Sequence, residues 1–275
     1  MTRHFVSLAV LWVFVTAVVE TLLFVDLFPT VGSEFAQESD DIVRYLLAIG
    51  IPVFAMAVSV IIYAMFQFRA KEDTETGAGF RGTGLFPKAW LVVTGGMAAA
   101  VMIYPGLIDL AKLQNTNSGS GWGEVDNIDL EVSVTGFRWA WQFEYPEYGI
   151  TLLGNTEPLV IPADERVRFS VDSTDVVHSF WVPAWRLKID AIPGRTTFIT
   201  VTPDKEGWSN WKRFPQWSDE TEGMAGESDD SFRVQCAELC GSDHGFMRFD
   251  LRVVSREEFD QWVADKQAQA QAKGN

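Results

Sequence analysis

Three long apolar runs fill the first 110 residues of this chain, and they constrain its fold more than any other feature. They span residues 5–28, 42–68 and 85–110. A helix needs roughly 20 mostly apolar residues to cross a bilayer, so the second and third runs predict membrane-spanning helices. We expect the first run to be a third helix. Its uncharged part, 5–19, also fits a signal peptide, so cleavage within residues 1–32 stays open.

Charged residues between the runs predict the orientation of the helices. The loop between the second and third runs carries Arg69, Lys71, Arg81 and Lys88, whereas the loop between the first and second is acidic and has no basic residue. Basic loops stay on the cytoplasmic side of a membrane. We therefore expect a multi-pass protein of the cell (plasma) membrane, with everything after Leu110 on the extracytoplasmic side.

The second half of the chain has the pattern of a β domain. Side chains alternate with a period of two, and turn signals separate the apolar stretches. Many short strands with frequent turns predict a sandwich or Greek-key barrel over residues 124–254. A capping box, Ser255 to Glu258, then predicts a C-terminal helix and tail over 255–275, with residues 266–275 frayed. We expect strands near residues 129–135, 139–145, 159–161, 167–171, 197–201, 232–235 and 248–254.

Charge argues against one class of partner. The net charge of −15 would repel a phosphate backbone, so we expect no nucleic acid. The acidic excess fits either a solvated surface or a docking face for a basic redox partner.

One short loop concentrates the groups that carry chemistry. The stretch from Cys236 to Met247 contains Cys240 and His244 and holds every cysteine of the chain. Thiolate, thioether and imidazole ligands together suit copper that changes oxidation state. A further ligand must come from elsewhere, and His178 is the only other histidine outside the N-terminal segment.

Other uses of these residues explain less of the pattern. A Cys236–Cys240 disulfide would leave both histidines and Met247 without a role. Zinc could take two cysteines and two histidines, but the spacing differs from common finger patterns and methionine is not a usual zinc ligand. A thioredoxin-like motif needs two residues between its cysteines rather than three. The set therefore favours copper.

The loop resembles the binuclear copper A motif of cytochrome c oxidase subunit II, a family of haem–copper terminal oxidase subunits. The resemblance extends over residues 43–262. It includes the aromatic segment 139–145, the segment 175–178 and the segment 187–194. It implies transmembrane helices (two or three) followed by a cupredoxin-like Greek-key β-barrel.

The resemblance assigns a role to each residue of the motif. Cys236 and Cys240 would bridge two copper ions, and His178 and His244 would each bind one of them. Met247 and the backbone carbonyl of Glu238 would be weak ligands. The side chain of Glu238 would reach a magnesium ion at the border with subunit I. Trp139 would accept electrons from the donor, with Trp141 as a packing neighbour, although pattern alone would make Trp139 a core or hairpin aromatic.

The implied function is electron transfer within an oxidoreductase of the respiratory chain. Electrons from cytochrome c or a small blue-copper protein would reach the copper pair and then a haem of subunit I. Oxygen reduction coupled to proton translocation would take place in that partner, together with other oxidase subunits and membrane lipid. The alternatives are a membrane-tethered copper redox carrier and a copper-delivery protein.

Two segments depart from the family pattern. An acidic insertion at about 205–231 carries Trp208, Trp211 and Trp217, and could be a surface loop, a partner-binding element or an adaptation to salt. Pro87 stands where many relatives carry a glutamate at the mouth of a proton channel, which puts proton entry through this subunit in doubt. Glu20 is either an intramembrane carboxylate with a function or a signal-peptide or interfacial residue.

Overall fold

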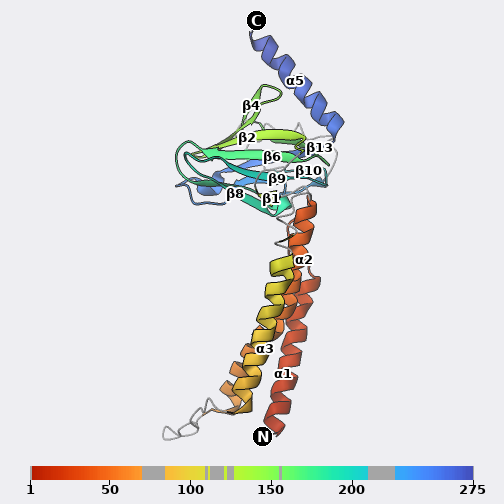
Figure 1. Cartoon of the computed structure of the whole chain (residues 1–275), viewed down its shortest axis with the longest axis vertical. Helices are drawn as coiled ribbons and strands as arrows, with labels where there is room; N and C mark the ends of the chain where they lie inside the picture. The colour runs from red at the N-terminus through yellow and green to blue at the C-terminus, as the bar shows by residue number, and fades with distance from the viewer. Residues whose placement is uncertain are drawn as a thin grey trace. The chain divides into compact units, whose positions relative to one another are not determined.

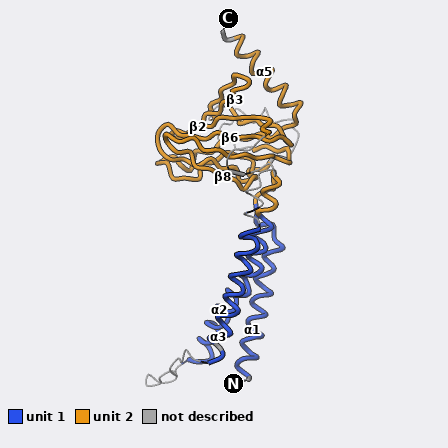
Figure 2. Tube along the Cα trace, in the orientation of Figure 1, with its two compact units in different colours: residues 1–28, 40–111 blue, residues 29–39, 112–275 orange. Residues whose placement is uncertain are grey.

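The protein divides into a helical unit and a β unit. The computed structural model describes residues 2–69, 84–108, 111, 121–122, 127–154, 157–209 and 227–274. The helical unit comprises residues 1–28 and 40–111, and the β unit comprises residues 29–39 and 112–275 (Figure 2). The chain therefore leaves the helical unit after Phe28 and returns to it at Asp40.

Three helices in the described part of the chain are long and apolar enough to cross a membrane. The helices are α1 (Thr2–Glu20), α2 (Glu34–Gln67) and α3 (Leu85–Val101), shown in Figure 1. A 3-10 turn η1 (Thr21–Phe24) follows α1, and a π-type turn η2 (Met102–Leu107) containing Pro105 follows α3. Of the two or three predicted helices, all three are present, including the run that also fitted a signal peptide.

Polar contacts join the first two helices. The indole Nε1 of Trp12 donates a hydrogen bond to the carbonyl of Pro52 at 2.8 Å. Nδ1 of His4 is hydrogen-bonded to the hydroxyl of Tyr63, also at 2.8 Å. In an apolar surrounding such groups are costly without a partner, so these contacts favour one pairing of α1 with α2.

Helix α2 begins at Glu34, eight residues before the expected start of the second apolar run. The hydroxyl of Ser33 accepts a hydrogen bond from the backbone N–H of Ala36 at 3.2 Å, which caps the helix. The acidic side chain of Glu34 lies in the first turn, where it stabilises the helix N-terminus. Hydrophobicity alone missed this start because the first turns of α2 are polar.

The β unit contains two sheets. The first has the strand order β1-β9-β6-β2-β3-β4. Its strands are β1 (Gly121–Trp122), β9 (Thr197–Val201), β6 (Val167–Ser173), β2 (Leu130–Phe137), β3 (Ala140–Tyr145) and β4 (Ile150–Leu153).

The second sheet has the order β11-β10-β13-β12-β7-β8, and β5 pairs in parallel with β13. Its strands are β11 (Glu227–Ser228), β10 (Gly207–Trp208), β13 (Arg248–Val254), β12 (Arg233–Cys236), β7 (His178–Val182), β8 (Leu187–Ala191) and β5 (Leu159–Pro162). Short 3-10 turns, η4 (Pro183–Trp185) and η6 (His244–Phe246), follow β7 and precede β13.

The core of the β unit lies between the two sheets. Every second residue of β2 and β6 is buried, as the period of two predicts. Phe169 of the first sheet packs against Phe180 of the second, with ring centroids 5.1 Å apart. Strands distant in sequence are neighbours in both sheets, as in a Greek key. The predicted fold class, apolar N-terminal helices followed by a cupredoxin-like β domain, is confirmed.

Residues 29–39, which we call the strap, are part of the β unit although they connect two helices of the other unit. The N–H of Gly32 donates to the carbonyl of Ala184 at 3.0 Å. Ser33 forms a bridge with Pro203 and is fully buried. The strap is thus packed into the β unit. The sequence pattern did not predict this arrangement.

Side chains of the β unit also hold the strap. The guanidinium of Arg186 donates to the carbonyls of Pro29 at 2.5 Å and Thr30 at 3.3 Å. Thr30 in turn donates its hydroxyl to the carboxylate of Asp229, and its N–H to the hydroxyl of Ser231 at 3.2 Å.

The ends of the predicted insertion at 205–231 belong to the second sheet. Strand β10 pairs with β13 and β11, so Trp208 lies in a strand rather than a loop. Trp211 and Trp217, like the rest of 210–226, lie outside the described residues.

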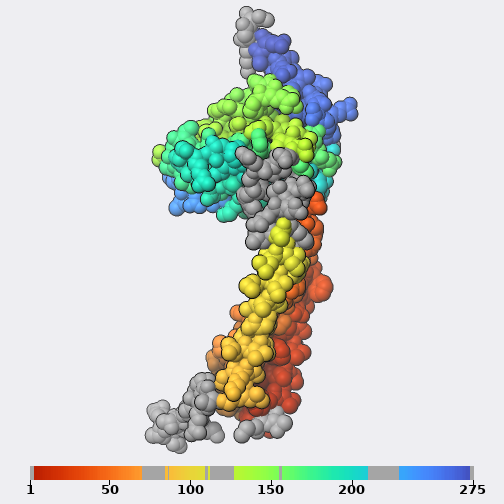
Figure 3. All heavy atoms as spheres, viewed as in Figure 1, coloured from red at the N-terminus to blue at the C-terminus, as the bar shows by residue number. Residues whose placement is uncertain are grey.

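The C-terminal helix α5 (Arg256–Gly274) closes the chain. The N–H of Glu258 donates to the hydroxyl of Ser255 at 3.2 Å, the hydrogen bond that the capping box predicts. Phe259 is fully buried and packs against Tyr145 and Tyr148. The prediction of a frayed end was wrong, because the helix continues to Gly274. Figure 3 shows the blue atoms of the C-terminal segment projecting beyond the green atoms of the β unit.

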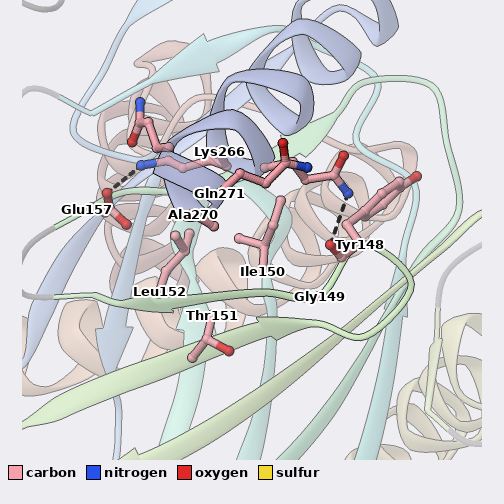
Figure 4. A pocket seen from close by; sticks show the side chains of 11 residues that line it. Tyr148, Gly149, Ile150, Thr151, Leu152, Glu157, Lys266, Ala270 and Gln271 are labelled. Atoms are coloured by element: carbon pink, nitrogen blue, oxygen red, sulfur yellow. Dashed lines mark hydrogen bonds and ion pairs between the residues drawn. The ribbon is translucent and has the colours of Figure 1, made fainter. Parts of the chain in front are cut away.

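A cavity of about 530 Å³ lies between α5 and the hairpin of β3 and β4 (Figure 4). Lys266 pairs with Glu157 on one side of it, and Gln267 donates to the carbonyl of Tyr148 on another. None of the predicted copper ligands lines this cavity.

Candidate metal centre

Two adjacent strands and the loop between them position the predicted ligands. Cys236 ends β12, and the chain returns as β13 directly after Met247. The N–H of Cys236 donates to the carbonyl of Met247 at 2.9 Å, which closes the base of the loop. His178 begins β7, whose residue Phe180 lies opposite Cys236. Sheet pairing therefore brings a histidine 58 positions away to the cysteine loop.

Five predicted ligand side chains converge at one end of the second sheet. The sulfurs of Cys236 and Cys240 are 3.8 Å apart. Nδ1 of His178 lies 3.9 Å from the Cys236 sulfur, and Nδ1 of His244 lies 3.6 Å from the Cys240 sulfur. The thioether sulfur of Met247 lies 3.8 Å from Cys240. Each thiol thus has one imidazole beside it.

Glu238 has its main chain and its side chain in different surroundings. Its carbonyl oxygen lies 3.1 Å from the Cys236 sulfur, inside the cluster. Its side chain is exposed. In the described part of the chain, the only group of three or more His, Cys, Asp or Glu residues placed to hold an ion is His178, Cys236 and Cys240.

Most of the cluster is shielded from water. His178 and Met247 are fully buried, and Cys236 and Cys240 are 1% and 5% exposed. His244 is half-buried. An ion held here would sit in a largely dry site with one histidine near the surface.

The pKa values of the two thiols are shifted in opposite directions. Burial disfavours a thiolate at Cys236, but hydrogen bonding with His178 and with backbone groups outweighs it and lowers the pKa to about 7. Burial and the neighbouring charge of Cys236 raise the pKa of Cys240 to about 12. Burial alone would lower the pKa of His178, but its hydrogen bonds with Cys236 and Asp175 raise it. A bound cation would favour thiolates at both cysteines.

The residues fit a soft metal. Both cysteines are free, and their separation far exceeds a disulfide bond of about 2.05 Å. The sulfur–sulfur separation is shorter than the summed length of two metal–thiolate bonds of about 2.3 Å each, so one ion can contact both sulfurs. Two thiolates, two imidazoles and a thioether are ligands that copper accepts. The thioether beside Cys240 distinguishes this set from a Cys₂His₂ zinc site.

Trp139 lies against the cysteine loop. It is the second residue of a two-residue turn between β2 and β3, where Phe137 pairs with Ala140. A Cβ placed on Gly241 would lie 3.1 Å from its indole Nε1, so the ring is in contact with the residue that follows Cys240. This nitrogen is buried and has no acceptor among the described residues.

Trp141 packs against His178 rather than against the cysteine loop. It is fully buried, and its ring meets the ring of His178 edge-on, with centroids 5.9 Å apart. Trp141 is thus a buried neighbour of a predicted ligand, whereas Trp139 is half-buried.

Reasoning from the sequence missed one residue of this site. The carboxylate of Asp175 is hydrogen-bonded to Nε2 of His178 at 2.9 Å. Its position three residues before a predicted ligand was the available signal.

Comparisons with known proteins agree on one family. A family model described as the periplasmic domain of cytochrome c oxidase subunit II matches residues 149–212, a stretch that contains His178 and ends before the cysteine loop. The probable cytochrome c oxidase subunit 2 of Rickettsia bellii is 26% identical over 253 residues, which cover 86% of this chain and 81% of the relative. Cytochrome c oxidase subunit 2 of Synechocystis is 27% identical and covers 86% of this chain and 75% of the relative.

One solved structure is similar to part of this chain. The periplasmic domain of subunit II of the cytochrome oxidase of Bradyrhizobium japonicum is 30% identical, with a TM-score of 0.42. The matched region covers 53% of this chain and 99% of that one.

Proposed function

Because this chain belongs to the cytochrome c oxidase subunit II family, we propose that it is the electron-accepting subunit of a haem–copper terminal oxidase and holds a binuclear copper A centre. The family is that of an oxidoreductase subunit with a membrane anchor and an extracytoplasmic β domain. The single observation that carries the proposal is the convergence of two thiols, two imidazoles and a thioether at the end of one sheet.

The ligands divide into strong and weak ones. Cys236 and Cys240 would hold two copper ions through their sulfurs, with His178 and His244 as the nitrogen ligands. Met247 and the carbonyl of Glu238 would be the weak ligands, which their places beside the two sulfurs support. When bound, copper supplies one-electron redox chemistry.

The surrounding residues keep the centre rigid and dry. The buried positions of His178, Cys236 and Met247 exclude water, and sheet pairing fixes the two strands that carry His178 and Cys236. A site that cannot rearrange changes little in geometry between its oxidised and reduced states. This suits rapid electron transfer rather than bond-making chemistry.

Trp139 would be the point where electrons enter. Its contact with Gly241, one residue after Cys240, and its half-buried ring support this role. The donor would be cytochrome c or a small blue-copper protein. His244, the less buried histidine, would face a haem of subunit I, where oxygen is reduced and protons are translocated.

Glu238 would contribute a second, hard-metal site. Its exposed carboxylate would bind magnesium at the border with subunit I, while its carbonyl faces the sulfurs. We further propose that the membrane is the cell (plasma) membrane and that other oxidase subunits and lipid surround the helices.

The test is copper content and electron paramagnetic resonance of the full-length chain loaded with copper. Residues 29–39 belong to the β unit, so a fragment beginning after the third helix would lack part of the domain. We expect two coppers per chain that share one unpaired electron. His178→Ala should abolish that signal, whereas His4→Ala, in the helical unit, should keep it.

One copper with a localised signal would contradict the proposal and favour a copper-delivery protein. Co-purification distinguishes an oxidase subunit from the remaining alternative, a membrane-tethered redox carrier. An oxidase subunit should purify with a haem-containing membrane partner, whereas a membrane-tethered redox carrier should purify without haem.

A further inference from the structure

The carboxylate of Asp175 lies between two parts of the site that come from different strands. Asp175 is in the turn between β6 and β7. Its side chain is 23% exposed, so most of it is enclosed by the residues it contacts.

One carboxylate oxygen orients His178. Oδ1 is hydrogen-bonded to Nε2 of His178 at 2.9 Å and accepts from the N–H of Val176 at 2.6 Å. The other ring nitrogen, Nδ1, faces the sulfur of Cys236 at 3.9 Å. A carboxylate partner on Nε2 keeps the proton there, which leaves the lone pair of Nδ1 for a metal.

The other oxygen holds the turn that carries Trp139. Oδ2 accepts from the backbone N–H of Arg138 at 2.9 Å and from its Nε at 3.1 Å. Arg138 and Trp139 are the two residues of the turn between β2 and β3. A two-residue turn has little freedom, so fixing Arg138 also restricts the position of the adjacent indole.

We propose that Asp175 is a positioning residue that fixes the metal-facing nitrogen of His178 and the Arg138–Trp139 turn at the same time. This inference rests on the proposed function, and it extends that function to a residue outside the ligand set. One carboxylate thereby sets both the orientation of a copper ligand and the distance from the surface ring to the sulfur pair.

The same residue could instead act as a surface charge that attracts a basic donor. The contacts favour positioning, because both oxygens already accept hydrogen bonds and Arg138 neutralises the charge. A residue that only attracts a donor would need neither contact.

The experiment compares Asp175→Asn with Asp190→Asn in the assembled, copper-loaded oxidase. Both changes remove one negative charge, and Asp190 is exposed on β8. We expect Asp175→Asn to lower copper affinity by about 10- to 100-fold, as loss of a partner behind a metal ligand does. It should also change the nitrogen hyperfine couplings of the copper signal and slow reduction by cytochrome c. Asp190→Asn should leave affinity and signal as in the wild type.

Arg138→Gln is the second variant and leaves the hydrogen bond to His178 in place. It should slow reduction by cytochrome c without changing the copper signal. If Asp175→Asn and Asp190→Asn have the same copper affinity, signal and reduction rate, the positioning role is refuted. If the wild-type chain itself holds no copper pair, the proposed function fails instead, so the two failures are distinguishable.

Discussion

The strap allows a quantitative prediction, because one side chain makes several of the hydrogen bonds that hold it in the β unit. The guanidinium of Arg186 donates to the carbonyls of Pro29, Thr30 and Pro183, and two of these three belong to the strap. Arg186→Ala removes all three hydrogen bonds and leaves the carbonyls to find water.

The expected cost follows from those contacts. A buried hydrogen bond to a charged group contributes about 1.5–3 kcal/mol, and these are only partly buried, so we expect a total loss of about 2 kcal/mol in the free energy of unfolding. For a domain of this size that lowers the Tm of the β unit by about 6 °C. The measurement is a thermal melt of the full-length chain in detergent, followed by near-ultraviolet circular dichroism of the tryptophans.

Arg195→Ala is the matched control. Arg195 is an exposed arginine of the same domain, and exposed substitutions usually change stability by less than about 0.5 kcal/mol. If Arg186→Ala melts at the same temperature as Arg195→Ala, the hydrogen bonds from Arg186 to the strap do not stabilise the β unit.

Three further predictions concern the same unit. Burial alone would raise the pKa of Asp229, but the hydrogen bonds from Ser231 and Thr30 outweigh it and lower the pKa. The stabilisation by the Asp229 carboxylate is therefore present above its unfolded pKa of about 3.9 and is lost as pH falls below that value. Between pH 7 and pH 3, the free energy of unfolding should therefore fall less in Asp229→Asn than in wild type, as measured by denaturant titrations. An equal loss in both proteins would contradict this. Gly241 has φ of +130°, and a side chain there would press on Trp139, so Gly241→Ala should slow reduction by cytochrome c in stopped-flow measurements. Wild-type kinetics would refute the contact. A Cβ on Gly207 would lie 2.4 Å from the buried ring of Phe232, so Gly207→Ala should destabilise the β unit by about 1–3 kcal/mol in urea, and an unchanged midpoint would show that the ring can move.

Much of the architecture was predictable because it depends on local periodicity. The strands expected at 167–171, 197–201 and 248–254 differ from the observed ones by two residues at most. Helix α1 was less certain from sequence, because length and hydrophobicity do not distinguish a membrane helix from a signal peptide. Its hydrogen bond from Trp12 to Pro52 is a tertiary contact that no pattern within the first run contains.

The candidate metal site was also predictable in part, because some of its residues are close in sequence and others are not. Cys236, Cys240, His244 and Met247 lie within twelve residues, so their spacing alone indicated a metal. His178 was selected because the chain has so few histidines. Its distance from Cys236 depends on the pairing of β7 with β12, a contact between strands remote in sequence. Asp175 was missed because a carboxylate in a turn is ordinarily solvated.

The sequence by itself determined the sequential order of apolar helices and β domain and the family, and it predicted a donor set for copper, since the hydrophobic period and most of the predicted ligands are found in neighbouring residues. Only the tertiary structure decided that residues 29–39 belong to the β unit and that Asp175 contacts both His178 and Arg138. It also decided that the ends of the acidic insertion are strands of the second sheet. Each of these depends on hydrogen bonds between groups far apart in the chain, whose partners are fixed by how the two sheets pack and pair.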